Sequence, residues 1–186
     1  MKRGLIALPL LLACNGTPSE PAPAAVTTAV VVKPQVSWPA SSSIDERALA
    51  SLGDARSQLS RSPVPVLAPS ADSLRDGLER PTVIAAGEYY VITARNHGAT
   101  ISIQGTRAAH RYDGIDPHPG NKPLRKGMGF VTVNEGIRSA SFIENGVAYT
   151  VDVECAEHTD PRCTSDAFVT ELTNELVFVG GSRDER

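Results

Sequence analysis

Four side chains that could bind a cation or transfer protons lie close together in a segment rich in glycine and proline. The segment is residues 108–127, and the side chains are those of His110, Asp113, Asp116 and His118. Imidazoles and carboxylates serve both as ligands of divalent metals and as general acids and bases. Neither an HExxH nor an EF-hand spacing accompanies them, and such a composition is usually a solvated loop. We therefore predict a recognition loop without metal or cofactor, since loops of this length often carry function, with metal or catalytic chemistry as the alternative.

Two of the three cysteines, Cys155 and Cys163, are close enough in sequence to bond to each other. A disulfide would close a ring of about nine residues, worth about 2.5 kcal/mol in the chain-entropy model. A metal site is one alternative, because Glu154, His158 and Asp160 are nearby. Structural zinc sites, however, usually use four ligands and a shorter cysteine spacing, and redox-active pairs are typically separated by two residues. We predict the disulfide, with the metal site and the redox pair as alternatives.

The remaining candidates are weaker. The cations Lys122, Arg125 and Lys126 could contact a phosphate, but a solvated cationic strip is the simpler interpretation. Tyr89 and Tyr90 should project to opposite faces of one strand, so that one ring packs in the core and the other could stack on a sugar or peptide. The sequence contains neither a GxSxG elbow nor a P-loop. These observations favour binding over catalysis.

The first 14 residues carry a targeting signal. Lys2 and Arg3 precede the apolar stretch 5–13, which is too short to span a bilayer. The junction Leu11-Leu12-Ala13-Cys14 resembles the lipobox of bacterial lipoproteins. The resemblance implies cleavage before Cys14, a diacylglyceryl group on its sulfur, and attachment to a membrane of the cell envelope.

The net charge limits the classes of partner that we expect, and the residue after Cys14 limits the expected cellular location. The chain has 18 Lys and Arg against 21 Asp and Glu, a net charge of −3, and loss of the signal would make it more acidic. This balance argues against nucleic acid and against electrostatic docking on anionic lipid, so acyl chains on Cys14 would provide the anchor. Asn15 is not the aspartate that, in enteric lipoproteins, implies inner-membrane retention. We expect an outer-membrane protein facing the periplasm, with a protein or cell-wall partner.

The composition divides the chain into four regions. We predict a signal peptide over 1–13, a lipidated cysteine and Pro/Ala-rich tether over 14–40, one domain over 41–181, and a tail over 182–186. Within the tether, Val26 and the run Ala29-Val30-Val31-Val32 are β-prone. They suggest either an apolar patch within a linker, which we favour, or an N-terminal strand laid on the domain edge.

Two amphipathic helices should flank a run of strands. The first spans 43–59, with a capping box from Ser43 to Glu46 and a weak point at Gly53. The second spans 165–179, with the apolar stripe Phe168, Leu172, Leu176 and Val179.

Residues 82–155 alternate apolar and polar side chains in several short runs, and Asn145-Gly146 is the strongest hairpin signal. Because the helices lie before and after the strands, we predict an α+β fold: an antiparallel sheet of about five or six strands, with the N-terminal and C-terminal helices packed on one face.

The sequence thus predicts a lipid-anchored cell-envelope protein with a non-catalytic binding domain. One alternative is a metal-dependent or hydrolytic enzyme that uses the 108–127 loop. Another is an accessory subunit of an envelope complex that pairs an exposed sheet edge with a partner strand.

Overall fold

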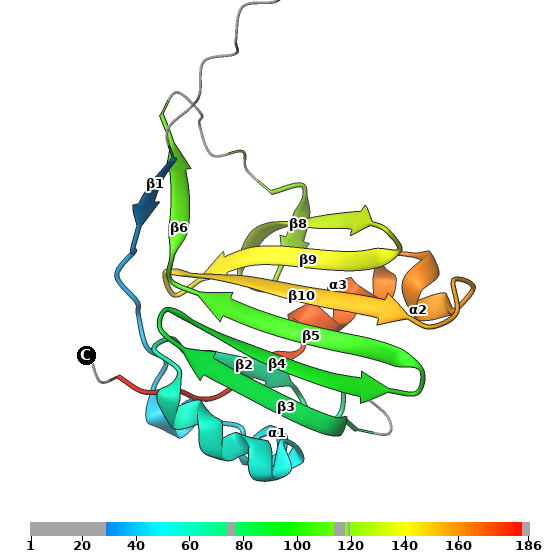
Figure 1. The fold of residues 1–186 in the computed structure, drawn as a ribbon, viewed down its shortest axis with the longest axis horizontal. Coiled ribbons are helices and arrows are strands. Elements are labelled where there is room, and N and C mark those ends of the chain that lie inside the picture. The colour runs from blue at the N-terminus through cyan, green and yellow to red at the C-terminus, as the bar shows by residue number, and fades with distance from the viewer. Residues whose placement is uncertain (1–28, 74–76, 114–117, 119, 184–186) are drawn as a thin grey trace, which may run out of the picture.

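A seven-stranded antiparallel sheet forms the centre of the computed structural model, which describes residues 29–73, 77–113, 118 and 120–183 (Figure 1). The strand order is β3-β4-β5-β10-β9-β8-β7, so two meanders join along β5 and β10. The strands are β3 (Glu79–Ala86), β4 (Tyr89–Asn96), β5 (Ala99–Thr106), β7 (Lys122–Leu124), β8 (Gly127–Asn134), β9 (Ile137–Glu144) and β10 (Val147–Cys155). Each meander is a run of short-range hairpins, which local sequence can specify.

Three of the hairpin turns have the geometry that the Asn145-Gly146 signal predicted. Both central residues have positive φ at His97-Gly98 (43° and 80°), at Glu135-Gly136 (50° and 85°) and at Asn145-Gly146 (56° and 76°). Two successive positive-φ residues define the type I′ turn, whose twist matches that of the strands it joins. Glycine at the second position makes this backbone accessible without steric cost.

A layer of short elements covers one face of the large sheet (Figure 1). Its helical elements are η1 (Ser41–Ser43), α1 (Glu46–Ser51), η2 (Gly53–Arg61), α2 (Pro161–Thr164) and α3 (Ala167–Asn174). A two-stranded antiparallel sheet of β2 (Val66–Pro69) and β11 (Leu176–Gly180) lies among them. Contacts join η2 to β3, β2 to β5, and α3 to β9 and β10, so the layer crosses the whole sheet. None of the described helices is long and apolar enough to cross a membrane.

One cross-strand row of the core combines three aromatic rings with alanine and two glycines. Ala85, Tyr90, Gly105, Tyr149, Phe142 and Gly129 are successive partners across β3, β4, β5, β10, β9 and β8. The rings of Phe142 and Tyr149 stack, with centroids 5.2 Å apart. A Cβ atom on Gly105 would lie 2.5 Å from Cε1 of Tyr90 and 2.8 Å from Cε1 of Tyr149. Gly105 therefore provides the space that the two tyrosine rings occupy.

The predicted N-terminal helix is interrupted. Gly53 has a φ of 55°, a left-handed conformation that ends α1 and begins the 3₁₀ segment η2. The N-cap is Asp45, whose carboxylate accepts from the amide of Ala48, so the capping box proposed for Ser43 and Glu46 is wrong. Gly53, which was expected to weaken the helix, is the point at which the chain changes from α-helix to 3₁₀-helix.

The predicted C-terminal helix is also too long. It ends at Asn174, and the residues expected to complete its apolar stripe, Leu176 and Val179, belong to β11. Both are buried, so their contribution to the core was predicted correctly but their conformation was not. Antiparallel pairing with β2 accounts for the difference, because it satisfies the backbone of Leu176–Gly180 in an extended form.

Three short strands occur where linker or loop was expected. Strand β1 (Ala29–Val32) pairs with β6 (Ala109–Tyr112) in a separate two-stranded sheet. Residues 29–32 therefore form a strand, as in the alternative to the linker, but this strand pairs with β6 and not with an edge of the large sheet. Strands β6 and β7 likewise divide the 108–127 loop. The amide of Ser37 donates to the carbonyl of Asn145 at 2.9 Å, which holds this part of the predicted tether against the domain. Residues 1–28, which include Cys14, lie outside the described residues.

The observed architecture is therefore mostly β. The antiparallel sheet and the helices on one face match the predicted α+β class in outline, but the sheet has seven strands instead of five or six. The additional strands are β3, whose first residues precede the predicted start at Thr82, and the short β7.

Gly105→Ala should destabilise the protein because the new methyl group overlaps two buried rings. We expect a loss of about 1–3 kcal/mol in the free energy of unfolding, the usual cost of overpacking a core. The control is Gly127→Ala, since a Cβ there meets nothing within 4 Å. Urea unfolding of both variants measures the effect. An equal change in both would contradict the packing account.

Candidate ligand groove

Two adjoining cavities form a groove where the β3–β4 turn meets the covering layer. The larger has a volume of about 710 Å³ and the smaller about 330 Å³, and both are lined by Pro63, Arg107 and Ser182. We call the two together the groove. Its larger part is also lined by Ser60, Arg61, Ala85, Ala86, Gly87 and Glu88, and its smaller part by Lys33, Pro34, Gln35, Val36, Trp38 and Arg183.

Backbone contacts bring these distant segments together. The amide of Arg107, just after β5, donates to the carbonyl of Glu88 at 3.1 Å. The amide of Ser182, just after β11, donates to the carbonyl of Ser62 at 2.8 Å, and the buried Ser62 hydroxyl donates to the carbonyl of Val64 at 2.7 Å. The groove therefore depends on how the covering layer sits on the sheet.

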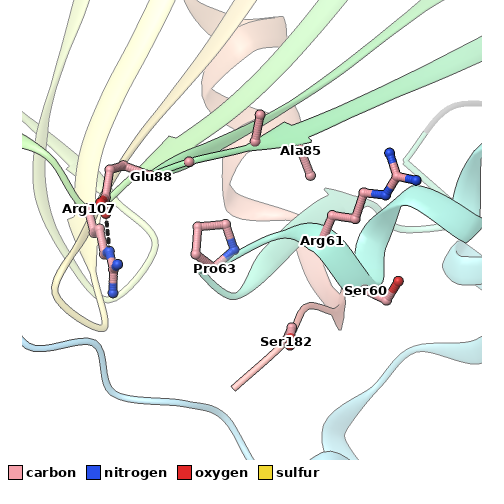
Figure 2. A pocket seen from close by; sticks show the side chains of 9 residues that line it. Ser60, Arg61, Pro63, Ala85, Glu88, Arg107 and Ser182 are labelled. Carbon is pink, nitrogen blue, oxygen red and sulfur yellow. Dashed lines mark hydrogen bonds and ion pairs between the residues drawn. The ribbon is translucent and has the colours of Figure 1, made fainter. Parts of the chain in front are cut away.

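An ion-pair chain occupies one side of the groove. The carboxylate of Glu88 accepts from Lys33 Nζ at 2.6 Å. It also accepts from Arg107 Nε, the contact drawn in Figure 2. The hydrogen bond from Arg107, followed by that from Lys33, lowers the pKa of Glu88 to about 2. Glu88 is thus a carboxylate at any physiological pH and fixes the two cations beside it.

Arg61 lies across the groove from this chain. Figure 2 shows Arg61 and Arg107 on opposite sides of Pro63. The smaller cavity adds Arg183, whose Nη2 donates to the carbonyl of Pro39 at 2.8 Å. Four cations and one carboxylate thus line a groove in a chain whose acidic residues outnumber its basic ones.

The predicted loop site does not converge in the described residues. His110 is exposed on β6, opposite Val31, and Asp113 is exposed just after that strand. His118 lies against Phe130 of β8, with ring centroids 5.9 Å apart. Asp116 lies outside the described residues. Within the described part, no three His, Cys, Asp or Glu side chains are placed to hold one metal ion.

The three cations of the predicted strip, Lys122, Arg125 and Lys126, all take part in ion pairs. Arg125 pairs with Glu144, and these two side chains are only 11 % and 10 % exposed. Burial alone would raise the pKa of Glu144, but the hydrogen bond and charge of Arg125 outweigh it and lower that pKa. Lys126 also pairs with Glu144, and Lys122 pairs with Asp166. This strip therefore joins β7, β8 and β9 to the covering layer.

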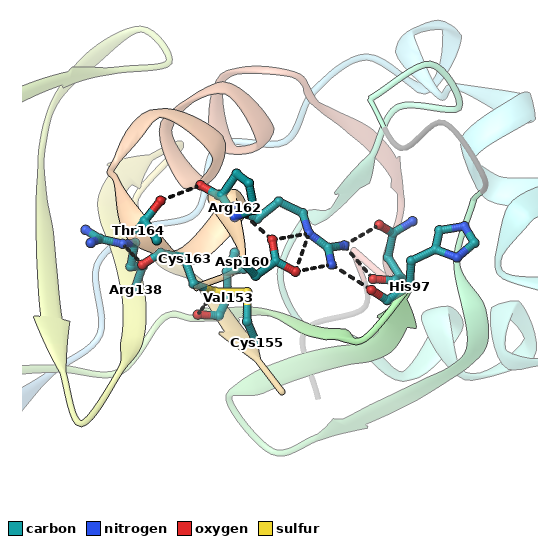
Figure 3. Close-up of a disulfide and its surroundings, with 10 residues drawn as sticks. His97, Arg138, Val153, Cys155, Asp160, Arg162, Cys163 and Thr164 are labelled. Carbon is teal, nitrogen blue, oxygen red and sulfur yellow. Dashed lines mark hydrogen bonds and ion pairs between the residues drawn. A yellow bond between two sulfur atoms is a disulfide. The ribbon is translucent and has the colours of Figure 1, made fainter. Parts of the chain in front are cut away.

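The cysteine pair lies at the junction of β10 and α2 (Figure 3). The sulfur atoms of Cys155 and Cys163 are 2.08 Å apart, the bonding distance that the predicted disulfide requires. Arg138 Nε donates to the carbonyl of Cys163 at 2.6 Å. The pair thus fastens α2 to the end of the sheet.

Arg162 ties the same region to the β4–β5 turn. Its guanidinium donates to the carbonyls of Asn96 and His97, each at 2.6 Å, and binds the carboxylate of Asp160. The hydrogen bonds from the Arg162 side chain and amide lower the pKa of Asp160 to about 2. Asp160, one of the ligands considered for a metal, therefore serves as the partner of Arg162.

No protein-family model, curated protein or solved structure matches this chain. The groove was also missed by sequence reasoning, because its residues come from five segments and no two of its cations are neighbours in sequence. In the structure, Lys33, Arg61, Arg107 and Arg183 lie at or shortly after the ends of β1, η2, β5 and β11, and no sequence pattern singles them out.

Proposed function

We propose that this protein is a lipid-anchored component of a bacterial cell envelope whose domain binds an envelope ligand in the groove without transforming it. The observation that carries the proposal is the groove itself, a concave site built from segments far apart in sequence. Sites of this kind are the default location for ligand binding. The lipobox at Leu11-Leu12-Ala13-Cys14 supports the anchor and, with Asn15, an outer-membrane location facing the periplasm.

The position of the groove suits a tethered protein. The segment that lines its smaller cavity, starting at Lys33, directly follows β1, the first described strand of the chain. The chain between Cys14 and Ala29 cannot exceed about 50 Å even when fully extended. The groove would therefore work close to the membrane surface, within reach of the neighbouring cell wall and of membrane-bound proteins.

A second candidate, an accessory subunit of an envelope complex, is favoured by the other face of the large sheet. That face carries Ile84, Met128 and Ile143, which are 55 %, 53 % and 75 % exposed, with Tyr89 and Phe130 beside them. Several exposed apolar side chains on one sheet face are typical of a surface that contacts another protein. In this alternative the open face, rather than the groove, would make the contact.

Cys14→Ser should release the protein from the membrane. Without the thiol there is no acceptor for the lipid, so we expect uncleaved precursor or a soluble mature form. Fractionation of cells followed by immunoblotting measures this, with wild type as the reference. Normal cleavage and retention in the membrane fraction would contradict the anchor.

Filling the groove should abolish ligand capture in cells. Ser60 lines the larger cavity and Ser57 does not, yet both are exposed on η2. We expect Ser60→Trp to lose the adducts that formaldehyde crosslinking gives with wild type in intact cells, and Ser57→Trp to retain them. Gel shift of unheated samples detects protein adducts, and retention on sacculi washed in detergent without boiling, which would reverse the crosslinks, detects cell-wall adducts. Loss in both variants, retention in both, or no adduct in wild type would contradict the proposed site.

A further inference from the structure

We infer that the groove recognises an oxyanion, a carboxylate or phosphate group carried by its ligand. This inference rests on the proposed function and names the ligand chemistry of the same site. Its basis is the convergence of Lys33, Arg61, Arg107 and Arg183 on two adjoining cavities to which the described residues contribute a single carboxylate, that of Glu88.

Arg61 is the residue best placed to meet the ligand. Its side chain is exposed and, within the described residues, makes no ion pair or hydrogen bond, so no protein carboxylate neutralises it there. It lines the larger cavity from the end of η2, on the other side of Pro63 from the Glu88–Arg107 pair (Figure 2). A guanidinium presents its donors in a planar fork that matches carboxylate and phosphate oxygens.

Glu88 orients the cations opposite without cancelling the field of the cluster. It binds both Lys33 and Arg107 and holds them at the wall of the groove. Among the described residues, one carboxylate against four cations leaves the lining positive, and a positive cleft with low-dielectric walls concentrates anions. The chain as a whole is negative, so the surplus of acidic side chains lies on other parts of the surface. The positive charge is therefore concentrated locally at the groove.

The shape of the groove indicates a ligand longer than a free ion. The two cavities meet at Pro63, Arg107 and Ser182, and the smaller one continues to Trp38, whose ring lies near Gly181. A group bound between Arg61 and Arg107 would therefore be followed by a segment that lies against an aromatic ring. The observations favour an acidic portion of an extended envelope molecule over an isolated ion.

Anion titration of two charge-matched variants tests the inference. Arg56 and Arg61 are both exposed on η2, but only Arg61 lines the groove. The full mature lipidated chain, in nonionic detergent, is titrated calorimetrically with citrate and separately with inorganic phosphate. We expect one or both anions to bind, Arg61→Gln to weaken binding at least about tenfold, and Arg56→Gln to leave it unchanged.

The two titrants distinguish the sources of the oxyanion: binding of citrate alone indicates a carboxylate ligand, and binding of phosphate alone a phosphorylated one. Failure of both anions to bind the wild type, or an equal loss in both variants, would overturn the inference. If Ser60→Trp still abolishes crosslinking in cells while neither anion binds, the groove remains the site but its ligand is not anionic. If anions bind as expected and Ser60→Trp retains its adducts, the proposed function fails instead.

Discussion

Two buried tyrosine hydroxyls hold the covering layer on the large sheet. The hydroxyl of Tyr90 accepts from the amide of Leu67 at 2.9 Å and donates to its carbonyl, and the hydroxyl of Tyr149 donates to the carbonyl of Pro65 at 2.9 Å. Burial raises the pKa of both phenols, so they remain protonated donors. Buried backbone groups are costly when unpaired. The tyrosines therefore fix both the separation of β2 from the large sheet and its position along that sheet.

The rest of the structure follows from this attachment. The side chains of Tyr90 and Tyr149 reach Leu67 of β2 and the preceding Pro65, and Gly105 lies between them and leaves room for both rings. Strand β2 in turn pairs with β11, which brings Ser182, just after β11, back to Ser62. The same stretch, Arg61–Pro63, forms one wall of the groove. A shift of β2 relative to the sheet would therefore change the width of the groove even though the same cations would still line it.

The features that depend on neighbouring residues were predictable from the sequence. The Asn145-Gly146 turn, the strands around it and the pairing of Cys155 with Cys163 are specified within about ten residues and occur as expected. Leu176–Val179 was assigned to a helix because its apolar spacing fits either conformation, and its partner strand lies more than a hundred residues earlier. The short run Ala29–Val32 is a strand for the same non-local reason, its pairing with β6.

The candidate site was less predictable than the fold. Sequence proximity drew attention to His110, Asp113, Asp116 and His118, but the two histidines lie on different parts of the structure, one on β6 and one against Phe130. The groove combines residues as distant as Lys33 and Arg183, and only the packing of the layer places them together. The lipobox is a local signal, and the anchor that it implies remains a prediction.

Hydrogen exchange at one amide tests the central claim most directly. Tyr90→Phe removes the hydroxyl that accepts from the Leu67 amide, whereas Tyr89→Phe removes the hydroxyl of the neighbouring ring on the exposed face. If the tyrosine hydroxyls hold β2 in place, NMR-detected exchange of the Leu67 amide will be at least about tenfold faster in Tyr90→Phe than in wild type, and unchanged in Tyr89→Phe. Equal exchange rates at Leu67 in wild type and Tyr90→Phe would contradict the account.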